Sequence, residues 1–404
     1  MPRRACFSIL FFSVTALAAD RSYTVNRYSA DITLDFVHHS IKAAETIHLQ
    51  ASERQIELDA NEIVIDSVAI AKRAIPFSQT PGHVLIELPK VGPATLTLDY
   101  HGSPAKGVIF SNNEAFAPYN TSHWLVVNHL PSDLATIHLR LHTPANVTVI
   151  SNGDKRSIPD FVMGFAVGPF AQADERSGKI ALRYLSTKYT SVQLAQIFRL
   201  TPQAMQFFEA KSGVPYPSRT YSQVMVSGDP EQELGDFTLL PNSYGETLLA
   251  HPEEAWLLAH ELAHQWWGIG IACRDWSDVW LNEGIATFMA DVFLGEQFGL
   301  PRYQHEIDIA QQIYEKLKAA GKDHALSYRG KGENEVGGRL PYMKGAWVLH
   351  LLKQRMGDDA FWHGLQIYTR TNWGRTVTSE DFQAAMQRAS ASDLTAFFTQ
   401  WVYR

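Results

Sequence analysis

Hydrophobic and polar residues alternate in short runs over the first part of the chain. The segment YTVNRYSADITLDF (residues 23–36) alternates in this way, and further β-rich runs follow it, separated by Pro, Gly, Asn and Asp. A period of two places one set of side chains on a buried face, which is typical of half-buried strands. These further runs are TIHLQ, QIELDA, EIVIDSVAI, HVLIEL, ATLTLDY, TIHLRLHTP and VTVISNG. We therefore predict an antiparallel, mostly β domain over residues 20–174.

The apolar spacing changes to a helical period near residue 175. Residues 191–213 are expected to form a helix that ends at Gly213, and two strands are expected at 220–228 and 237–241, around a polar loop. The helices expected after them cover residues 253–268, 281–298, 302–320, 340–356 and 379–402. The pattern predicts an α+β fold, in which a mainly helical second domain over residues 175–404 follows the β domain.

The first residues have the pattern of a secretory signal peptide. The basic MPRR is followed by an apolar run of 14 residues, ACFSILFFSVTALA, and by the Ala16-Leu17-Ala18 cleavage pattern. The run is too short to span a bilayer, so we expect residues 1–19 to be removed on export to the periplasm or the medium. Cleavage would leave Cys273 as the one cysteine of the mature chain, most simply a small buried residue.

Charge argues against two classes of partner. The net charge of the 404 residues is −7, and no basic block interrupts the sequence. Binding to nucleic acid or to an anionic membrane surface is therefore not indicated, nor is a stable membrane span.

The segment AHELAHQWWG (residues 259–268) carries the strongest chemical signal. His260 and His264 are four residues apart, so on a helix they project from one face and can hold one metal ion. Glu261 lies on the flank of that face, where it can hold a water molecule. A third ligand is expected from Glu283, which follows His264 by nineteen residues on the next predicted helix. Two imidazoles and a carboxylate favour one Zn²⁺ per chain, with an open fourth position.

This ligand set predicts hydrolysis. Zinc lowers the pKa of a bound water molecule toward about 7. We expect Glu261 to take a proton from that water as it attacks a carbonyl group, and to deliver the proton to the leaving amine.

The pattern resembles the gluzincin metallopeptidases of the aminopeptidase N and leukotriene hydrolase type. HELAHQWWGIGIACRDWSDVWLNEG (260–284) is similar to the zinc motif of that family, and RLPYMKGAWVLHLL (339–352) is similar to its Y-x-K-G helix. GVPYPSRTYSQVMV (213–226) and the segment from TSEDF to FFTQWV (378–402) extend the likeness. The resemblance implies a thermolysin-like catalytic domain, zinc ligands His260, His264 and Glu283, and general base Glu261. It also implies that Tyr342 hydrogen-bonds the oxyanion.

The sequence departs from the family at two places. The family has a G-A/G-M-E-N motif whose glutamate binds the substrate's α-amino group, whereas this chain has SGDPEQELGDFTLLP (227–241). Aligning Gly235 puts Gln232 at the glutamate position, flanked by Glu231 and Glu233. These side chains are either substrate-binding or solvated loop charges. The second departure is a short form, without the family's C-terminal helical domain, which would leave a more open site.

Three functions are compatible with these residues. The first is a secreted aminopeptidase acting on a peptide or protein substrate. The second is an endopeptidase, or a specialised peptidase with altered recognition of the N-terminus. The third is a non-catalytic binding protein on the same scaffold, although all the residues that catalysis needs are present together. Side-chain preference and oligomeric state are not encoded in any motif.

Overall fold

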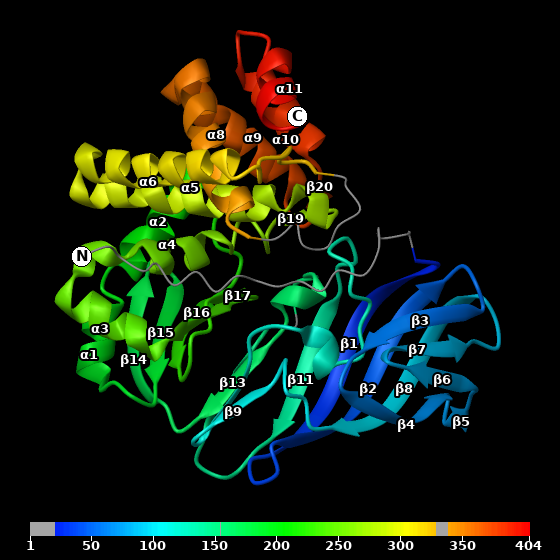
Figure 1. Ribbon diagram of the computed structural model, residues 1–404. Helices are drawn as coiled ribbons and strands as arrows, with labels where there is room; N and C mark the ends of the chain where they lie inside the picture. The colour runs from blue at the N-terminus through cyan, green and yellow to red at the C-terminus, as the bar shows by residue number, and fades with distance from the viewer. Residues whose placement is uncertain (1–20, 154, 329–337) are drawn as a thin grey trace.

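The computed structural model describes residues 21–153, 155–328 and 338–404 of the chain (Figure 1). The predicted signal peptide, residues 1–19, lies outside the described residues, so it stays a prediction. Within the described residues, every helix is too short or too polar to cross a membrane.

The N-terminal part is built on a six-stranded sheet with the order β11-β1-β2-β8-β4-β5. A three-stranded sheet, β3-β7-β6, lies beside it. Buried residues alternate with exposed ones along β1 and β2, so one face of the sheet is apolar. Ile32, Ile47, Leu58 and Val84, drawn from both sheets, are fully buried in one core. The bounds are β1 Tyr23–Asp35, β2 Ser40–Ala51, β3 Gln55–Ala60, β4 Ile63–Ile70, β5 Arg73–Ala74, β6 Phe77–Thr80, β7 Gly82–Glu87, β8 Gly92–Gly102 and β11 Thr136–His142.

One strand pair differs from the expected antiparallel arrangement. β11 runs parallel to β1, with Arg27 opposite Thr136, whereas the other pairs described in this sheet are antiparallel. Parallel neighbours need a long crossover. Here β11 returns to β1 only after more than 100 residues of other strands and loops, so local alternation could not show its direction.

Two smaller sheets connect the β domain to the helices. The first has the order β12-β13-β10-β9, and the second has the order β14-β15-β16-β18-β17. Their bounds are β9 Ile109–Ser111, β10 Glu114–Ala117, β12 Thr148–Ser151, β13 Phe165–Gly168, β14 Ala171–Ser177, β15 Ile180–Ser186, β16 Thr220–Val226, β17 Gln232–Leu234 and β18 Phe237–Pro241. The predicted domain boundary between residues 174 and 175 falls inside β14 and stays a prediction.

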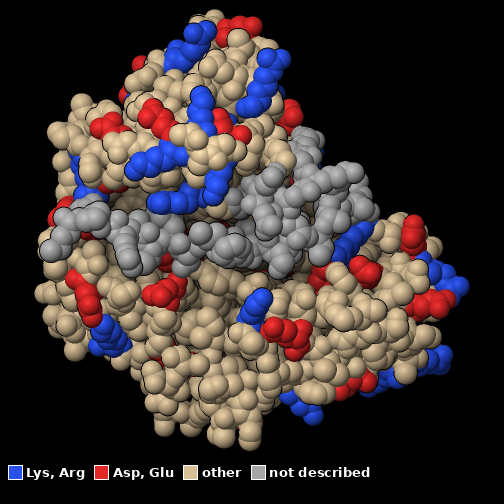
Figure 2. All heavy atoms as spheres, viewed as in Figure 1, with Lys and Arg blue, Asp and Glu red and all other residues tan. Residues whose placement is uncertain are grey.

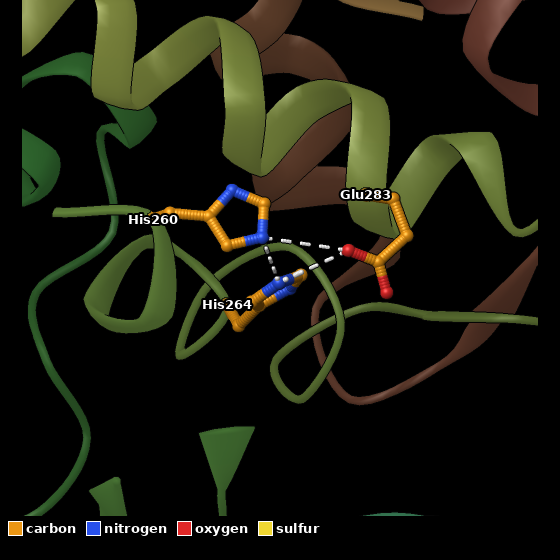
Figure 3. Close-up of side chains that lie close together, drawn as sticks. All are labelled: His260, His264 and Glu283. Atoms are coloured by element: carbon orange, nitrogen blue, oxygen red, sulfur yellow. Dashed lines mark hydrogen bonds and ion pairs between the residues drawn. The ribbon is translucent and has the colours of Figure 1, made fainter. Parts of the chain in front are cut away.

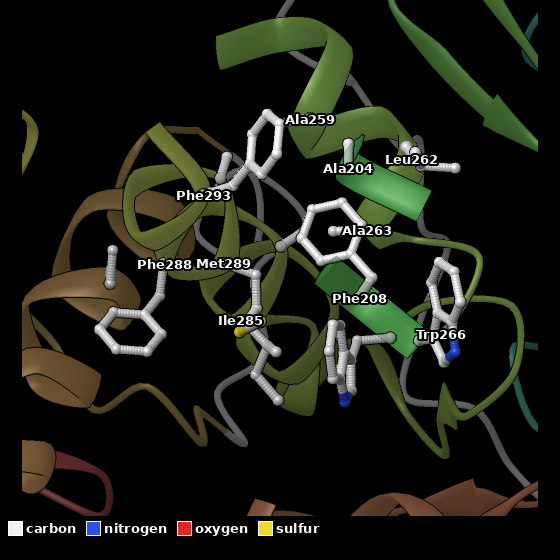
Figure 4. Close-up of a cluster of buried hydrophobic side chains, with 14 of the residues drawn as sticks. Ala204, Phe208, Ala259, Leu262, Ala263, Trp266, Ile285, Phe288, Met289 and Phe293 are labelled. Carbon is white, nitrogen blue, oxygen red and sulfur yellow. The ribbon is translucent and has the colours of Figure 1, made fainter. Parts of the chain in front are cut away.

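Most helices of the second part of the chain lie above the five-stranded sheet, and α1 and α3 lie beside it (Figure 1). Their apolar faces meet in a core that includes Phe208, Trp266, Ile285, Met289 and Phe293 (Figure 4). This core surrounds the two helices that carry the predicted metal ligands, α4 and α5. The bounds are α1 Ser191–Ile197, α2 Thr201–Ser212, α3 Asn242–Ala250, α4 Trp256–Ala263, α5 Trp280–Phe298, α6 Leu300–Ala319, α8 Leu340–Met356, α9 Asp358–Asn372, α10 Ser379–Ala389 and α11 Thr395–Trp401.

The helices differ from the expected ranges in identifiable ways. The expected helix over 191–213 is two helices, because Pro202 has no N–H to continue the ladder from α1 and instead starts α2. The range 379–402 is likewise divided, since Ser390 and Asp393 bind nearby backbone N–H groups between α10 and α11. The helix expected over 253–268 is confined to α4, and helices α3 and α9 were not expected.

The loop between α4 and α5 ties the two parts together. Ile269, Cys273, Trp276 and Val279 belong to the same core as the β-domain strands. Cys273 is a buried free thiol, as expected. Acidic and basic side chains are intermixed on the face shown in Figure 2.

Candidate active site

Two helices bring the predicted metal ligands together. His260 lies in the last turn of α4 and His264 caps its end, while Glu283 lies in the first turn of α5. The two Nε2 atoms are 3.1 Å apart, and the Glu283 Oε2 atom lies 3.5 Å from Nε2 of His260 and 3.4 Å from Nε2 of His264 (Figure 3). All three residues are buried. The three side chains therefore converge on one point, as the spacing predicts.

The orientation of His264 is fixed by its second ring nitrogen. Its Nδ1 atom lies 3.0 Å from the carbonyl oxygen of Trp267, so Nδ1 carries the proton and donates it. The lone pair of Nε2 then points at the site, which is the arrangement that metal-bound histidines usually have. Gly268 is needed beside it, because a Cβ atom there would lie 2.9 Å from Nδ1.

His260 is held by aromatic rings. Its imidazole stacks on Trp256, with centroids 4.7 Å apart, and lies nearly parallel to the ring of Tyr342 at 5.9 Å. The Trp256 indole N–H donates to Asp291 at 2.8 Å, which fixes that ring in turn. Trp256 thus helps to orient a candidate metal ligand, in addition to packing against the core.

The three ligand atoms fit a zinc ion. Ligand atoms of tetrahedral zinc lie about 2.1 Å from the metal and hence about 3.4 Å from one another, close to the separations found here. The Glu283 Oε2 atom is buried and has no hydrogen-bond partner within the described parts of the chain. A buried carboxylate oxygen without a partner is costly, and a cation at this point would remove that cost.

Charges in the site also favour a cation. Burial would raise the pKa of Glu283, but His264 and His260 lower it to about 2. Burial would lower the pKa of His264, but the carboxylates of Glu233 and Glu283 raise it to about 10. The carboxylates of Glu233 and Glu283 therefore stabilise a positive charge between these side chains, and a divalent ion supplies one.

Glu261 lies beside the ligands as expected. Its side chain is buried, and its Oε2 atom has no hydrogen-bond partner among residues 21–153, 155–328 and 338–404. Burial, and then the charge of Glu233, raise the pKa of Glu261 well above its ordinary value. A carboxylate with a raised pKa is a stronger base than a solvated one.

Tyr342 approaches the site from α8. Its side chain is half-buried and its ring lies beside His260. Burial raises the pKa of the phenol well above its ordinary value, and the charge of Glu283 raises it further. The hydroxyl therefore stays protonated and can donate a hydrogen bond.

The segment with Glu231, Gln232 and Glu233 is not a solvated loop. Residues 232–234 form β17, the edge strand of the five-stranded sheet, and Gln232 and Glu233 are buried. A Glu233 oxygen lies within 4.8 Å of ligand atoms of Glu261 and His264. Gln232, which the alignment put at the glutamate position, donates from Nε2 to Glu233 Oε2 at 2.8 Å. The backbone of Glu231 is bound by the Tyr119 hydroxyl.

Two residues at this site had no signal in the sequence. Tyr119 comes from the segment after β10, and Gln265 follows His264; both contact the β17 segment. Gln265 lies next to the motif, but only the tertiary structure shows what its amide binds.

Comparison with known proteins agrees with this geometry. Residues 197–401 match the family described as "Peptidase family M1 domain". The chain belongs to peptidase family M1. This confirms the predicted resemblance to the aminopeptidase N type, and membership implies a catalytic Zn²⁺ that the donor set above fits.

Curated relatives of this M1 chain are longer proteins. It is 21% identical to "Probable aminopeptidase 2" of Sulfurisphaera tokodaii and 22% identical to "Leucyl aminopeptidase" of Saccharolobus solfataricus. Each match covers 94% of this chain and 53% of the relative. The M1 chain therefore spans about half the length of these relatives.

Solved structures show the same fold. A crystal structure of an M1 zinc metallopeptidase from Deinococcus radiodurans superposes with a TM-score of 0.77 at 22% identity, covering 95% of this chain and 94% of that one. A mutant of that metallopeptidase bound to Tyr-Ser-Ala gives 0.79 at 21% identity, covering 95% of both chains. The predicted β domain followed by a helical peptidase domain is thus confirmed.

Proposed function

We propose that the chain is a zinc-dependent aminopeptidase, which releases residues from the free N-terminus of a peptide. The observation that carries this proposal is the position of Glu233, a buried carboxylate within 4.8 Å of Glu261 and His264. A carboxylate in such a position can bind the ammonium group of a substrate.

The short distance between Glu233 and Glu261 supports removal of a single residue from the N-terminus. The α-nitrogen and the carbonyl carbon of one residue are two bonds apart, or about 2.5 Å. A group that binds the ammonium must therefore lie close to the base that acts at the carbonyl, as Glu233 does to Glu261. An endopeptidase would need room there for the preceding residue, whereas Glu233 lies on the buried strand β17.

Each remaining side chain has a role that its position supports. His260, His264 and Glu283 would hold the zinc ion, which supplies Lewis-acid polarisation and acidifies water when bound. Glu261 accepts the proton of the attacking water molecule and passes it to the leaving amine. The protonated Tyr342 hydroxyl donates a hydrogen bond to the oxyanion as negative charge develops.

Names of related proteins support the same activity. The curated relatives above are called aminopeptidases, and the Deinococcus metallopeptidase binds the peptide Tyr-Ser-Ala. We also propose export to the periplasm or the medium, on the basis of the pattern in residues 1–19; sequencing the N-terminus of the mature protein from those fractions tests it.

The experiment compares aminoacyl p-nitroanilides that carry free or acetylated α-amino groups. The zinc-loaded chain should cleave the free substrates with a much higher kcat/KM than the acetylated ones. Glu233→Gln should lower kcat/KM for the free substrates about 10- to 100-fold, because one charge-assisted hydrogen bond is lost. Asp229→Asn, at an exposed acidic residue of the same segment, is the control and should have little effect.

Three outcomes would contradict the proposal. Equal cleavage of acetylated substrates would indicate an endopeptidase. A zinc-loaded chain that cleaves neither substrate class would indicate a binding protein. An unchanged preference for free amines in Glu233→Gln would remove this residue as the anchor.

A further inference from the structure

The turn that joins β17 to β18 has a left-handed residue that is not glycine. It contains two residues, Gly235 and Asp236, between the paired residues Leu234 and Phe237. Asp236, rather than Gly235, adopts the left-handed conformation, with a φ of 71°. Left-handed backbone is unfavourable for a residue with a Cβ atom, and β17 is only three residues long. We therefore expect contacts from outside the hairpin to help fix the position of Glu233 on β17.

Gln265 supplies bonds to both sides of this turn. Its Nε2 atom donates to the carbonyl oxygen of Leu234 at 2.8 Å, and its Oε1 atom accepts the N–H of Asp236 at 3.2 Å. The Gln265 side chain is fully buried, so water does not compete for either bond. A single amide group thus binds one backbone group on each side of the turn.

The other contacts of the turn come from elsewhere in the fold. Gly235 donates to Val162 and accepts from Asn152, both of the β-domain side. The Asp236 carboxylate accepts from Arg156 at 2.7 Å and from Ser218 at 2.6 Å. These contacts hold the turn against the β domain and the loop before β16, and Arg156 also donates to Gln265 Oε1 at 3.4 Å.

Gln265 differs from these groups because it follows His264 directly. On one side of its amide is a metal ligand, and on the other is Leu234, the neighbour of Glu233. The covalent and hydrogen-bonded path from His264 through Gln265 and Leu234 to Glu233 therefore contains one side-chain contact. We therefore expect a change in that contact to move Glu233 relative to the metal ligands.

We propose that Gln265 is a positioning residue that sets the distance between the metal ligands and Glu233, and thereby the preference for a free N-terminus. This inference rests on the proposed function, in which Glu233 binds the substrate's ammonium group. Gln265 itself need not touch substrate, since both of its polar atoms are used by the hairpin backbone.

The test is a double-mutant cycle read out as substrate preference. Gln265→Met keeps the approximate length of the side chain and removes its hydrogen bonds with Leu234, Asp236 and Arg156. It should lower the ratio of kcat/KM for free over acetylated aminoacyl p-nitroanilides about 10-fold, the size of effect seen when a residue that supports a metal ligand is replaced. The variant should still hold about one zinc per chain. In a Glu233→Gln background the same substitution should leave that ratio unchanged, because the anchor is already absent.

A matched control and a second variant keep the result interpretable. Gln223→Met removes another fully buried glutamine, whose Oε1 atom accepts from Thr201; it should reduce stability without changing the ratio. Gln265→Glu keeps the acceptor for Asp236, and should fall between wild type and Gln265→Met.

Equal effects of Gln265→Met in the two backgrounds, or lost stability with an unchanged ratio, would overturn the positioning role. If Glu233→Gln alone leaves the ratio unchanged, the proposed anchor is wrong and this inference fails with it. If Glu233→Gln lowers the ratio but Gln265→Met does not, the proposed function stands and only this inference fails.

Discussion

Gly284 of α5 and Gly345 of α8 touch backbone to backbone, because a Cβ atom at Gly345 would lie 2.7 Å from the Gly284 Cα atom. Gly284 follows Glu283, and Gly345 lies one turn beyond Tyr342. The contact therefore sets how closely α8 can bring its tyrosine to the metal ligand on α5.

Gly345→Ala should separate these helices. We expect a loss of about 1–3 kcal/mol in the free energy of unfolding, as for other overpacked cores, together with a fall in kcat as Tyr342 moves. Urea unfolding and steady-state kinetics measure the two effects. Gly295→Ala is the control, since its Cβ would press on Tyr303, far along α5 from Glu283; it should lose stability and retain kcat. Wild-type kcat in Gly345→Ala would contradict this account.

Glu261 and Glu283 are both buried carboxylates at the site, yet their replacement by glutamine should have different results. Glu283→Gln should lose most of its zinc, because the Oε2 atom facing both imidazoles is replaced or neutralised. Glu261→Gln should keep about one zinc per chain and lose about 10²- to 10⁴-fold in kcat. Metal analysis of the purified variants, with activity, checks both. If the two variants hold equal zinc and have equal activity, the assignment of Glu283 as ligand and of Glu261 as base is wrong.

Zinc removal should also lower stability. A metal that binds only the folded chain adds about 2.7 kcal/mol at a free concentration 100 times its Kd. The Tm of the chelator-treated chain should therefore be lower than that of the zinc-loaded chain, and should return when zinc is restored. The Glu283→Gln variant serves as the control, because its Tm should not respond to zinc.

Local geometry explains why the metal ligands could be predicted from the sequence. His260 and His264 lie on one helical turn, where a spacing of four fixes their relative direction. Glu283 follows at a family-specific spacing, and α5 needed only to pack against α4 to bring it in. The strands of the β domain were predictable for a similar reason, since their period of two is local.

The position of Glu233, the proposed amine anchor, depends on contacts that no local pattern contains. Aligning Gly235 with the family motif puts Gln232 at the position of the glutamate that binds the α-amino group. The side chain that reaches Glu261 and His264 is instead Glu233. Its placement depends on a left-handed Asp236 and on Gln265, which lies beyond the end of α4. The parallel pairing of β11 with β1 is likewise a long-range feature.

Tyr342→Phe isolates the hydroxyl group from the ring. The ring should still stack beside His260, so we expect zinc content and stability close to wild type. Loss of the hydrogen bond to the oxyanion should lower kcat about 10²- to 10³-fold, with little change in KM. Normal kcat in Tyr342→Phe would show that the tyrosine only packs against the helix. Tyr303→Phe, at a tyrosine whose hydroxyl contacts His350, is the control and should retain kcat.

Glu45, on β2, should make the stability of the folded chain depend on pH. The side chain is 1% exposed; its Oε2 atom accepts the N–H of Val126, and its Oε1 atom has no partner within the described residues. Burial raises the pKa of Glu45 from 4.5 to about 8. The folded state therefore keeps this proton while the unfolded state loses it.

The sign of the effect follows from the raised pKa. Below pH 4.5 the carboxyl is neutral in both states, so no stability is lost. Between pH 4.5 and about 8 the unfolded state alone ionises, and stability falls with rising pH by up to about 5 kcal/mol. Glu45→Gln cannot ionise, so its free energy of unfolding should fall less over this range and exceed the wild-type value at about pH 8. Urea unfolding from pH 4.5 to about 8 measures this, with exposed Glu53→Gln as the control that should follow wild type. Parallel curves for Glu45→Gln and wild type would show that Glu45 is already ionised in the folded chain.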